Sequence, residues 1–180
     1  MIITISGQAG SGKSTAAKLL AKKLRMKHYS VGDLRRKMAL ERGMTLAQLN
    51  RLGEKEIFTD KEADDYQREL GRKEDNFVID GRLSFHFIPH SVKIFLTADL
   101  KVRTKRVFSD ERKTEKFHSL EEVEKALVER EKSDIKRYKK YYGINSFDTK
   151  YYDLVIDTTR LGPNQVVEKI IKFLKERKKM

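Results

Sequence analysis

The chain of 180 residues fits one domain and is long enough to bury a hydrophobic core without a disulfide or a metal to staple it. It has no cysteine, no apolar run long enough to span a membrane and no secretory signal at its N-terminus, so we expect a cytoplasmic protein without disulfides or thiol chemistry. Forty lysines and arginines against 27 aspartates and glutamates give a net charge of +13, which suits an anionic ligand, either nucleotide phosphates or a nucleic-acid backbone.

Short apolar runs rich in β-branched residues predict buried strands at 2–6, 76–80, 92–97 and 153–157, and a short extended piece is expected at 27–30. Helical patterns alternate with these runs at 13–24, 99–108 and 120–141, and a last helix follows Gly162-Pro163. Such alternation predicts an α/β fold, a three-layer domain whose five-stranded parallel sheet has helices on both faces. We find no linker and no second core, so residues 1–180 are predicted to form a single domain.

Residues 33–74 contain no strand-like run and are predicted to be a helical insertion on the sheet. Three segments resemble capping boxes, in which a hydroxyl and a later polar side chain satisfy free backbone N–H groups at a helix start. They begin at Ser30, Thr45 and Thr59, and they predict helices starting near residues 31, 46 and 60.

The strongest chemical signal follows the first strand, where residues 7–14 fit the pattern G-x-x-x-x-G-K-[ST] of a phosphate-binding P-loop. Glycines let backbone N–H groups turn inward around phosphate oxygens, and the motif lies at a strand–helix junction, as that chemistry requires. Lys13 is expected to reach the β- and γ-phosphates, and the Ser14 hydroxyl to bind Mg²⁺. The motif predicts binding of ATP or GTP with Mg²⁺.

Asp80 ends another apolar strand and is followed by Gly81 and Arg82. Ligands gather at the carboxyl ends of parallel strands, so Asp80 is placed to hold Mg²⁺ through water and Arg82 to hold an acceptor phosphate with its planar guanidinium. Gly81 would let the chain pass close to the phosphates. The alternative is an ordinary turn after a strand.

Arginines recur at helical spacing further along the chain. Arg103 and Arg106 lie three residues apart, and Asp134 lies between Arg130 and Arg137 at spacings of four and three, so each group shares one helix face. Phosphate-binding arginines with a carboxylate for sugar hydroxyls or a base edge fit this pattern. An intrahelical ladder of ion pairs is the alternative for both groups.

Residues 136–142 interleave basic and aromatic side chains, which is typical of a platform for single-stranded nucleic acid. We favour the alternative that the tyrosines pack this helix against the domain while the lysines are solvated.

These features occur in the order found in nucleoside monophosphate kinases, and the chain most resembles cytidylate kinases of the archaeal type. The resemblance covers essentially the whole chain and rests on residues 7–14, 30–36, 78–82, 103–106, 129–137 and 155–160. Adenylate kinases usually have Asp-Gly-Phe-Pro-Arg where this chain has Asp80-Gly81-Arg82.

The resemblance implies a role for each matching position. The loop that binds ATP would consist of Gly7, Gln8, Ala9, Gly10, Ser11, Gly12, Lys13, Ser14 and Thr15. Residues 158–160 would pass by the adenine. The acceptor's phosphate would be held by Arg36, Arg82 and Arg137, its nucleoside would be contacted by Arg130 and Asp134, and the lid arginines would be Arg103 and Arg106.

We therefore expect transfer of a phosphoryl group from ATP to CMP or dCMP, with charge stabilised by Lys13, Mg²⁺, Arg103 and Arg106 and without a general base. Residues 33–74 would bind the acceptor, and residues 109–118 would form a short lid. Two alternatives stay open: an adenylate or uridylate kinase on the same fold, and a P-loop ATPase that regulates nucleic-acid or ribosome binding. We favour a monomer whose partners are the two nucleotides, with neither nucleic acid nor a membrane.

The composition also predicts heat stability. Charged residues make up 37% of the chain, cysteine is absent, and the thermolabile amides Asn and Gln number only four each, as in many hyperthermophile proteins. We expect the midpoint of thermal unfolding, followed by circular dichroism, to lie above the mesophile range of about 45–65 °C. A midpoint inside that range would contradict this prediction.

Overall fold

The computed structural model describes residues 1–110 and 117–177, and its centre is a five-stranded sheet in the order β2-β3-β1-β4-β5. All four neighbouring pairs are parallel, as the alternation of strands and helices predicts. The strands are β1 (Ile2–Gly7), β2 (Lys27–Ser30), β3 (Phe77–Asp80), β4 (Val92–Thr97) and β5 (Leu154–Asp157).

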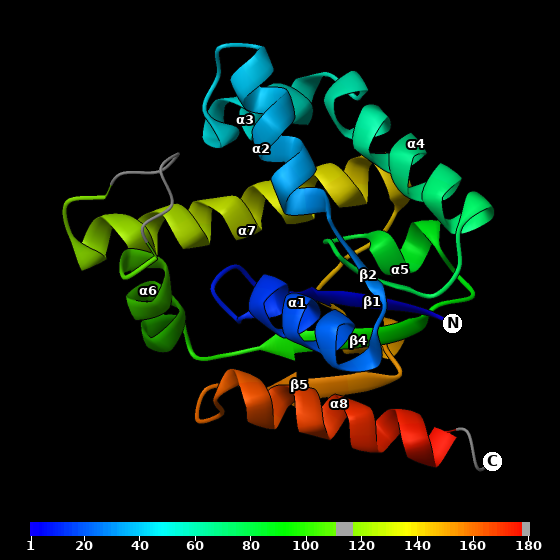
Figure 1. Cartoon of the computed structure of the whole chain (residues 1–180). Helices are drawn as coiled ribbons and strands as arrows, with labels where there is room; N and C mark the ends of the chain where they lie inside the picture. Colours follow the sequence, from blue (N-terminus) through cyan, green and yellow to red (C-terminus); the bar gives the residue numbers. More distant parts are fainter. Residues whose placement is uncertain (111–116, 178–180) are drawn as a thin grey trace.

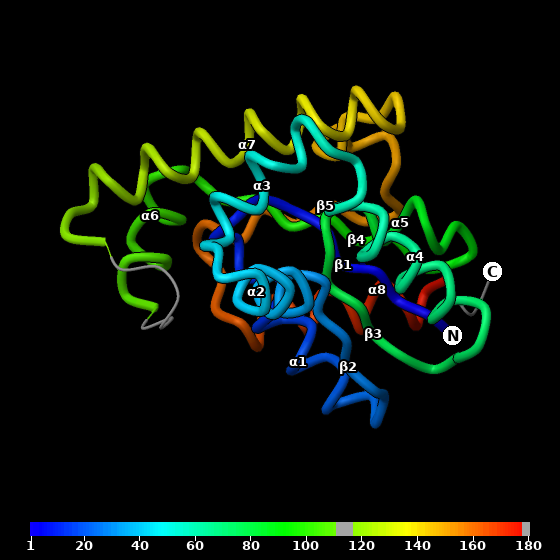
Figure 2. The backbone as a smooth tube through the Cα atoms, turned by 90° about the horizontal axis from the view of Figure 1, so that it is seen from above, coloured from blue at the N-terminus to red at the C-terminus, as the bar shows by residue number. Residues whose placement is uncertain are grey.

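Helices connect the strands and cover both faces of the sheet (Figures 1 and 2). They are α1 (Lys13–Leu24), α2 (Val31–Glu41), α3 (Leu46–Lys55), α4 (Phe58–Lys73), α5 (Ser84–Phe87), α6 (Leu100–Phe108), α7 (Leu120–Tyr142) and α8 (Pro163–Arg177), with a 3₁₀ turn at Thr149–Tyr151. The short helix α5 was not predicted, because four residues are too few to show a helical period.

The two-residue period of a strand divides the core between the two faces of the sheet. Ile3 and Ile5 of β1 are fully buried in one cluster with residues of α1 and α8. Ile2 of β1, with Phe77 and Ile79 of β3, packs instead against α2, α3 and α4. The sheet is therefore buried on both sides, and polar groups reach its carboxyl edge only where the strands end.

The insertion consists of α2, α3 and α4, as predicted, and lies to one side of the sheet, where α7 runs past it (Figure 1). Ser30 caps α2 by accepting from the N–H of Asp33, and Thr45 and Gln48 form the complete capping box of α3. The cap at Thr59 was wrong. Helix α4 begins at Phe58, and Thr59 lies fully buried in its first turn.

The basic and aromatic run at residues 136–142 packs the C-terminal end of α7 against the molecule. Tyr138 is buried, and the Tyr141 hydroxyl donates to the Gly53 carbonyl at 2.8 Å. Lys136 pairs with Glu54 across the gap to α3 at 2.9 Å. This arrangement matches packing against the domain, because the tyrosines do not stand out as a stacking platform.

In the described parts of the chain, no helix combines the length and the apolar character needed to cross a membrane.

Candidate active site

A cavity of about 1250 Å³ opens at the carboxyl edge of the sheet, between the loop after β1 and helices α2, α3, α4 and α7. Most of the residues predicted for the site line it. They are Ala9, Gly10, Ser11, Gly12, Lys13, Ser14, Thr15, Arg36, Asp80, Arg82, Arg106, Arg130, Asp134 and Arg137. Gly7, Gln8 and Arg103 lie behind this lining.

The loop after β1 has the backbone conformation that its glycines permit. Gly7, Gly10 and Gly12 have φ angles of 143°, 78° and 89°, which side chains rarely allow. Gly10 also lies so close to Arg103 that a Cβ would stand 2.8 Å from the Arg103 carbonyl oxygen. The loop therefore turns tightly into the N-terminus of α1, where free N–H groups favour an anion.

Lys13 is held at the mouth of this loop. Its ammonium group donates to the Gln8 carbonyl at 2.7 Å. Burial lowers the pKa of Lys13 well below its ordinary value, and the charge of Arg82 lowers it further. A phosphate anion beside the ammonium would stabilise its charge, so the loop is built to gain energy from binding one.

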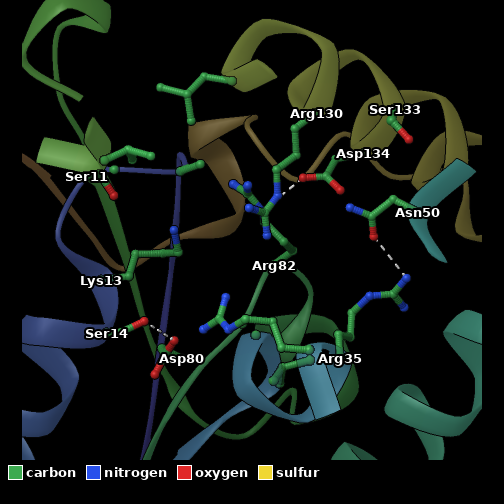
Figure 3. Close-up of a pocket in the computed structure, with 18 of the residues that line it drawn as sticks. Ser11, Lys13, Ser14, Arg35, Asn50, Asp80, Arg82, Arg130, Ser133 and Asp134 are labelled. Atoms are coloured by element: carbon green, nitrogen blue, oxygen red, sulfur yellow. Dashed lines mark hydrogen bonds and ion pairs between the residues drawn. The ribbon is translucent and has the colours of Figure 1, made fainter. Parts of the chain in front are cut away.

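Asp80 lies at the carboxyl end of β3 and is almost fully buried. The Ser14 hydroxyl donates to it at 2.8 Å (Figure 3), and the Ser30 hydroxyl donates to it at 3.1 Å. His28 of β2 lies against its other oxygen, with Nε2 2.7 Å from Oδ1. Three side chains, one from α1 and two from β2, therefore fix the orientation of the carboxylate.

A hydroxyl and a carboxylate in direct contact are the oxygen ligands that Mg²⁺ prefers. Among residues 1–110 and 117–177, no three His, Asp or Glu side chains are grouped to hold a metal ion without other ligands. Mg²⁺ binds to one or two protein ligands when nucleotide phosphates and water supply the rest, so Ser14 and Asp80 fit this ion beside the loop.

A chain of alternating charges forms the other side of the cavity. Asp134 of α7 accepts from Arg137 at 2.7 Å and pairs with Arg82 Nε at 2.9 Å (Figure 3). Asp60 of α4 then joins Arg137, at 3.0 Å, to Arg35 of α2, at 2.8 Å. All five side chains are largely buried, so this is not the solvated ion-pair ladder that the spacing on α7 also allowed.

The arginines decide the charge of the Asp134 carboxyl. Burial by itself raises its pKa, but the charges of Arg82, Arg137 and Arg130 outweigh burial, and the pKa lies below the ordinary value. Asp134 therefore stays ionised and holds two guanidinium groups at the edge of the cavity. Arg82 also donates to the Gly7 carbonyl at 2.5 Å, which ties this cluster to the P-loop.

The two lid arginines lie in different places. Arg106 lines the cavity and donates to Thr158 at 3.0 Å and 2.7 Å, next to the P-loop residue Ser11, whose carbonyl accepts from the Thr158 hydroxyl. Arg103 is buried, donates to the Ala9 carbonyl at 3.3 Å and pairs with Glu131, so here it supports the loop from behind.

The segment predicted to form the lid, residues 109–118, falls largely on residues 111–116, which lie outside the described residues. Its flanking residues Ser109, Asp110 and Phe117 line the cavity. A role for Arg103 as a lid arginine stays a prediction.

Gly81 is needed for packing more than for an approach to phosphates. A Cβ at this position would lie 2.3 Å from the Ser84 hydroxyl and 2.7 Å from a methyl group of Val31. The chain turns here from β3 toward α5, and Gly81 N–H donates to the Ile5 carbonyl at 3.2 Å. The turn thereby places Arg82 against the P-loop.

Several lining or supporting residues were missed. His28 lies on the strand next to Asp80, and in the sequence it is one of several polar residues in Lys27–Ser30, with no motif around it. Nothing in the sequence indicated Asn50 on α3 or Asp60 and Asp64 on α4. Polar residues on a helix usually face solvent, and α4 has no wide apolar stripe that would indicate which of its faces is buried.

Asp64 gives a pH-dependent prediction. Burial raises its pKa to about 7 from an ordinary 3.8, and the charge of Asp60 adds to this effect, against the hydrogen bond from Tyr142 and the charges of Arg68 and Arg35. The folded protein therefore holds a proton between about pH 4 and 7 that the unfolded chain releases, and stability falls as pH rises through that window. Asp64→Asn removes this loss, worth about 4 kcal/mol at most.

Urea unfolding at pH 5 and pH 8 measures the effect. We expect the free energy of unfolding of Asp64→Asn, relative to that of the parent chain, to be higher at pH 8 than at pH 5. An unchanged difference between variant and parent would contradict the raised pKa.

A model of the cytidylate kinase-like family matches residues 2–160. The chain belongs to this family. Three relatives named cytidylate kinase support the assignment across nearly the whole length. The protein from Methanocella arvoryzae is 40% identical over 179 residues, which cover 99% of each chain. The protein from Methanothrix thermoacetophila is 42% identical over 160 residues, which cover 89% of this chain and 90% of its own. The protein from Halobacterium salinarum is 38% identical over 173 residues, which cover 95% of this chain and 88% of its own.

Solved structures agree with the fold of this cytidylate kinase-like chain. An uncharacterised protein from Eubacterium ventriosum superposes with a TM-score of 0.72 at 22% identity, over 97% of this chain and 98% of its own. Shikimate kinase from Acinetobacter baumannii, solved in complex with shikimate, superposes with a TM-score of 0.65 at 16% identity, over 98% and 94%. At these identities the likeness concerns the α/β P-loop fold alone.

Proposed function

We propose that the chain transfers the γ-phosphoryl group of ATP to CMP, forming ADP and CDP, and that dCMP is also an acceptor. The observation that carries this is the buried cluster of Arg82, Asp134 and Arg137, which faces the same cavity as the P-loop. A nucleotide hydrolase needs only the P-loop side. A second phosphate-binding wall suits a second phosphorylated substrate, and membership of the cytidylate kinase-like family points to CMP.

On the donor side, the loop N–H groups and Lys13 bind the β- and γ-phosphates, and Ser14 and Asp80 hold Mg²⁺. The bound Mg²⁺ supplies positive charge that neutralises the phosphate oxygens. Thr158, Leu161 and Pro163 line the neighbouring part of the cavity and suit the adenine of ATP.

On the acceptor side, Arg82 and Arg137 bind the phosphate of CMP, with Arg36 and Arg130 at its periphery. Asp134 orients Arg82 and Arg137 by pairing with both, so that neither guanidinium turns away from the cavity to bind another oxygen of the protein. Binding therefore places an oxygen of the CMP phosphate in line with the γ-phosphate, and this positioning supplies much of the rate.

Phosphoryl transfer leaves little covalent work for the protein, so charge neutralisation dominates the chemistry. Negative charge on the transferring group is stabilised by Lys13 from the loop and by Arg106 from α6, with Arg103 as a further candidate if the lid closes. The acceptor phosphate is already ionised at neutral pH, so no general base is required. We also propose that the active form is a cytoplasmic monomer.

An acceptor panel at fixed ATP tests the proposal. ADP release is measured with CMP, dCMP, UMP and AMP, each alone, and without any acceptor. We expect CMP and dCMP to give the highest kcat/KM, and release without an acceptor to be far slower. Hydrolysis that needs no acceptor and is stimulated by RNA would favour the regulatory ATPase, and a preference for AMP or UMP would reassign the acceptor.

A further inference from the structure

The far wall of the cavity carries a carboxylate that phosphate binding does not use. Asp64 lies on α4, one turn beyond Asp60, and lines the cavity although only 6% of the residue is exposed. The Tyr142 hydroxyl, from the end of α7, donates to its Oδ2. This contact fixes the side chain and leaves Oδ1 to accept from a ligand.

Asn50 of α3 presents a donor on the same side of the cavity. Its Oδ1 accepts from Arg35 at 3.1 Å, so its amide nitrogen points the other way, toward the middle of the cavity (Figure 3). In that view Arg82 and Arg130 lie between Asn50 and the P-loop side chains Ser11 and Lys13. A monophosphate held by Arg82 with its phosphate toward the P-loop has room for its base on the side of α3 and α4, where Asn50 and Asp64 line the cavity.

Cytosine and uracil differ at the edge that such a wall would meet. Cytosine has an amino donor at C4 and an acceptor at N3, whereas uracil has a carbonyl acceptor at C4 and a donor at N3. At pH 8, above the raised pKa of about 7, Asp64 is ionised, and its carboxylate oxygens accept and do not donate. They complement the amino group of cytosine and are repelled by the carbonyl oxygen of uracil.

We propose that Asp64 is a specificity-determining residue, which selects CMP over UMP by accepting a hydrogen bond from the 4-amino group of cytosine. This inference rests on the proposed function. Burial deprives the carboxylate of water, which raises its pKa and makes a donor from the ligand correspondingly valuable. Adenine also carries an amino group beside a ring acceptor, so Asp64 discriminates against uracil but not against adenine. Exclusion of AMP must depend on the size of the cavity instead.

The test combines one variant with one altered substrate. At pH 8, kcat/KM is measured for CMP, UMP and a CMP analogue that has hydrogen in place of the 4-amino group, using the parent chain and Asp64→Ala. A site built around a hydrogen bond rejects the molecule that lacks it. We expect the parent chain to lose at least about tenfold on the analogue and on UMP, and Asp64→Ala to lose less than about threefold on either.

Asp65→Ala is the matched control. Asp65 lies on the same helix with an exposed side chain, paired only with Arg68 at the surface among the described residues, and its loss removes the same charge. It should keep the full penalty of the parent chain. If Asp64→Ala does not fold, Asp64→Asn decides, because an amide can accept from cytosine or donate to uracil, and the preference for CMP over UMP should fall at least about tenfold.

A folded Asp64→Ala that keeps the full penalty for the missing amino group would overturn the inference, and so would a parent chain that uses CMP and the analogue equally well. Both results would leave the proposed function standing. A parent chain that phosphorylates neither CMP nor UMP would instead refute the proposed function, and this is seen before any variant is made.

Discussion

Replacing Lys13 with alanine should lower kcat by about 100- to 1000-fold while the fold is retained. Lys13 lies at the mouth of the P-loop, where its ammonium group donates to the Gln8 carbonyl at 2.7 Å. Preorganised donors aimed at charge that develops in a transition state are worth about 3–4 kcal/mol each in enzymes. Because this charge develops during transfer, the loss should fall on kcat more than on the KM for CMP.

Lys18→Ala is the matched control, since Lys18 is exposed on the same helix and should leave both parameters unchanged. Circular dichroism verifies that each variant is folded, and initial rates at saturating ATP and CMP give kcat. A folded Lys13→Ala variant with more than about a tenth of the parent kcat would contradict a role for Lys13 in stabilising the transferring phosphoryl group.

Asp134→Ala should raise the KM for CMP at least about tenfold, equivalent to about 1.4 kcal/mol, with the KM for ATP little changed. The carboxylate holds Arg82 and Arg137 in place, and both lie on the acceptor side of the cavity. Removing it also takes a charged partner from each of two buried guanidinium groups, so the free energy of unfolding should fall by about 3–5 kcal/mol.

Asp134→Asn keeps the shape and one acceptor oxygen, and it separates the kinetic effect from unfolding if the alanine variant is too unstable to assay. Glu124→Gln, an exposed change of the same charge on α7, serves as the control. Equal damage to the use of ATP and of CMP, or an unchanged KM for CMP, would reduce Asp134 to a purely structural role.

The donor side of the site could be predicted from the sequence because its residues are neighbours in the chain. The P-loop follows a strand directly, and Asp80 ends the neighbouring strand, so the parallel sheet alone brings them together. The spacing on α7 also predicted correctly that Asp134 and Arg137 share a face, and the structure adds that this face is buried against α4 through Asp60.

The acceptor side could not be predicted to the same depth, because it depends on how α2, α3, α4 and α7 pack. Arg35 and Asp60 are 25 residues apart and meet only across the bundle. His28 meets Asp80 only because β2 lies beside β3 in the sheet. The false cap at Thr59 has the same origin: Thr59 is buried where a cap would be exposed, so tertiary packing overrode a local signal.

The most direct test of the account follows the phosphoryl group itself. ATP labelled in the γ-phosphate is incubated with CMP, and the products are separated. The account predicts that the label appears in the β-position of CDP, with one ADP formed for each CDP and almost no ATP consumed when CMP is left out. Label released as inorganic phosphate at the same rate with and without CMP would contradict it.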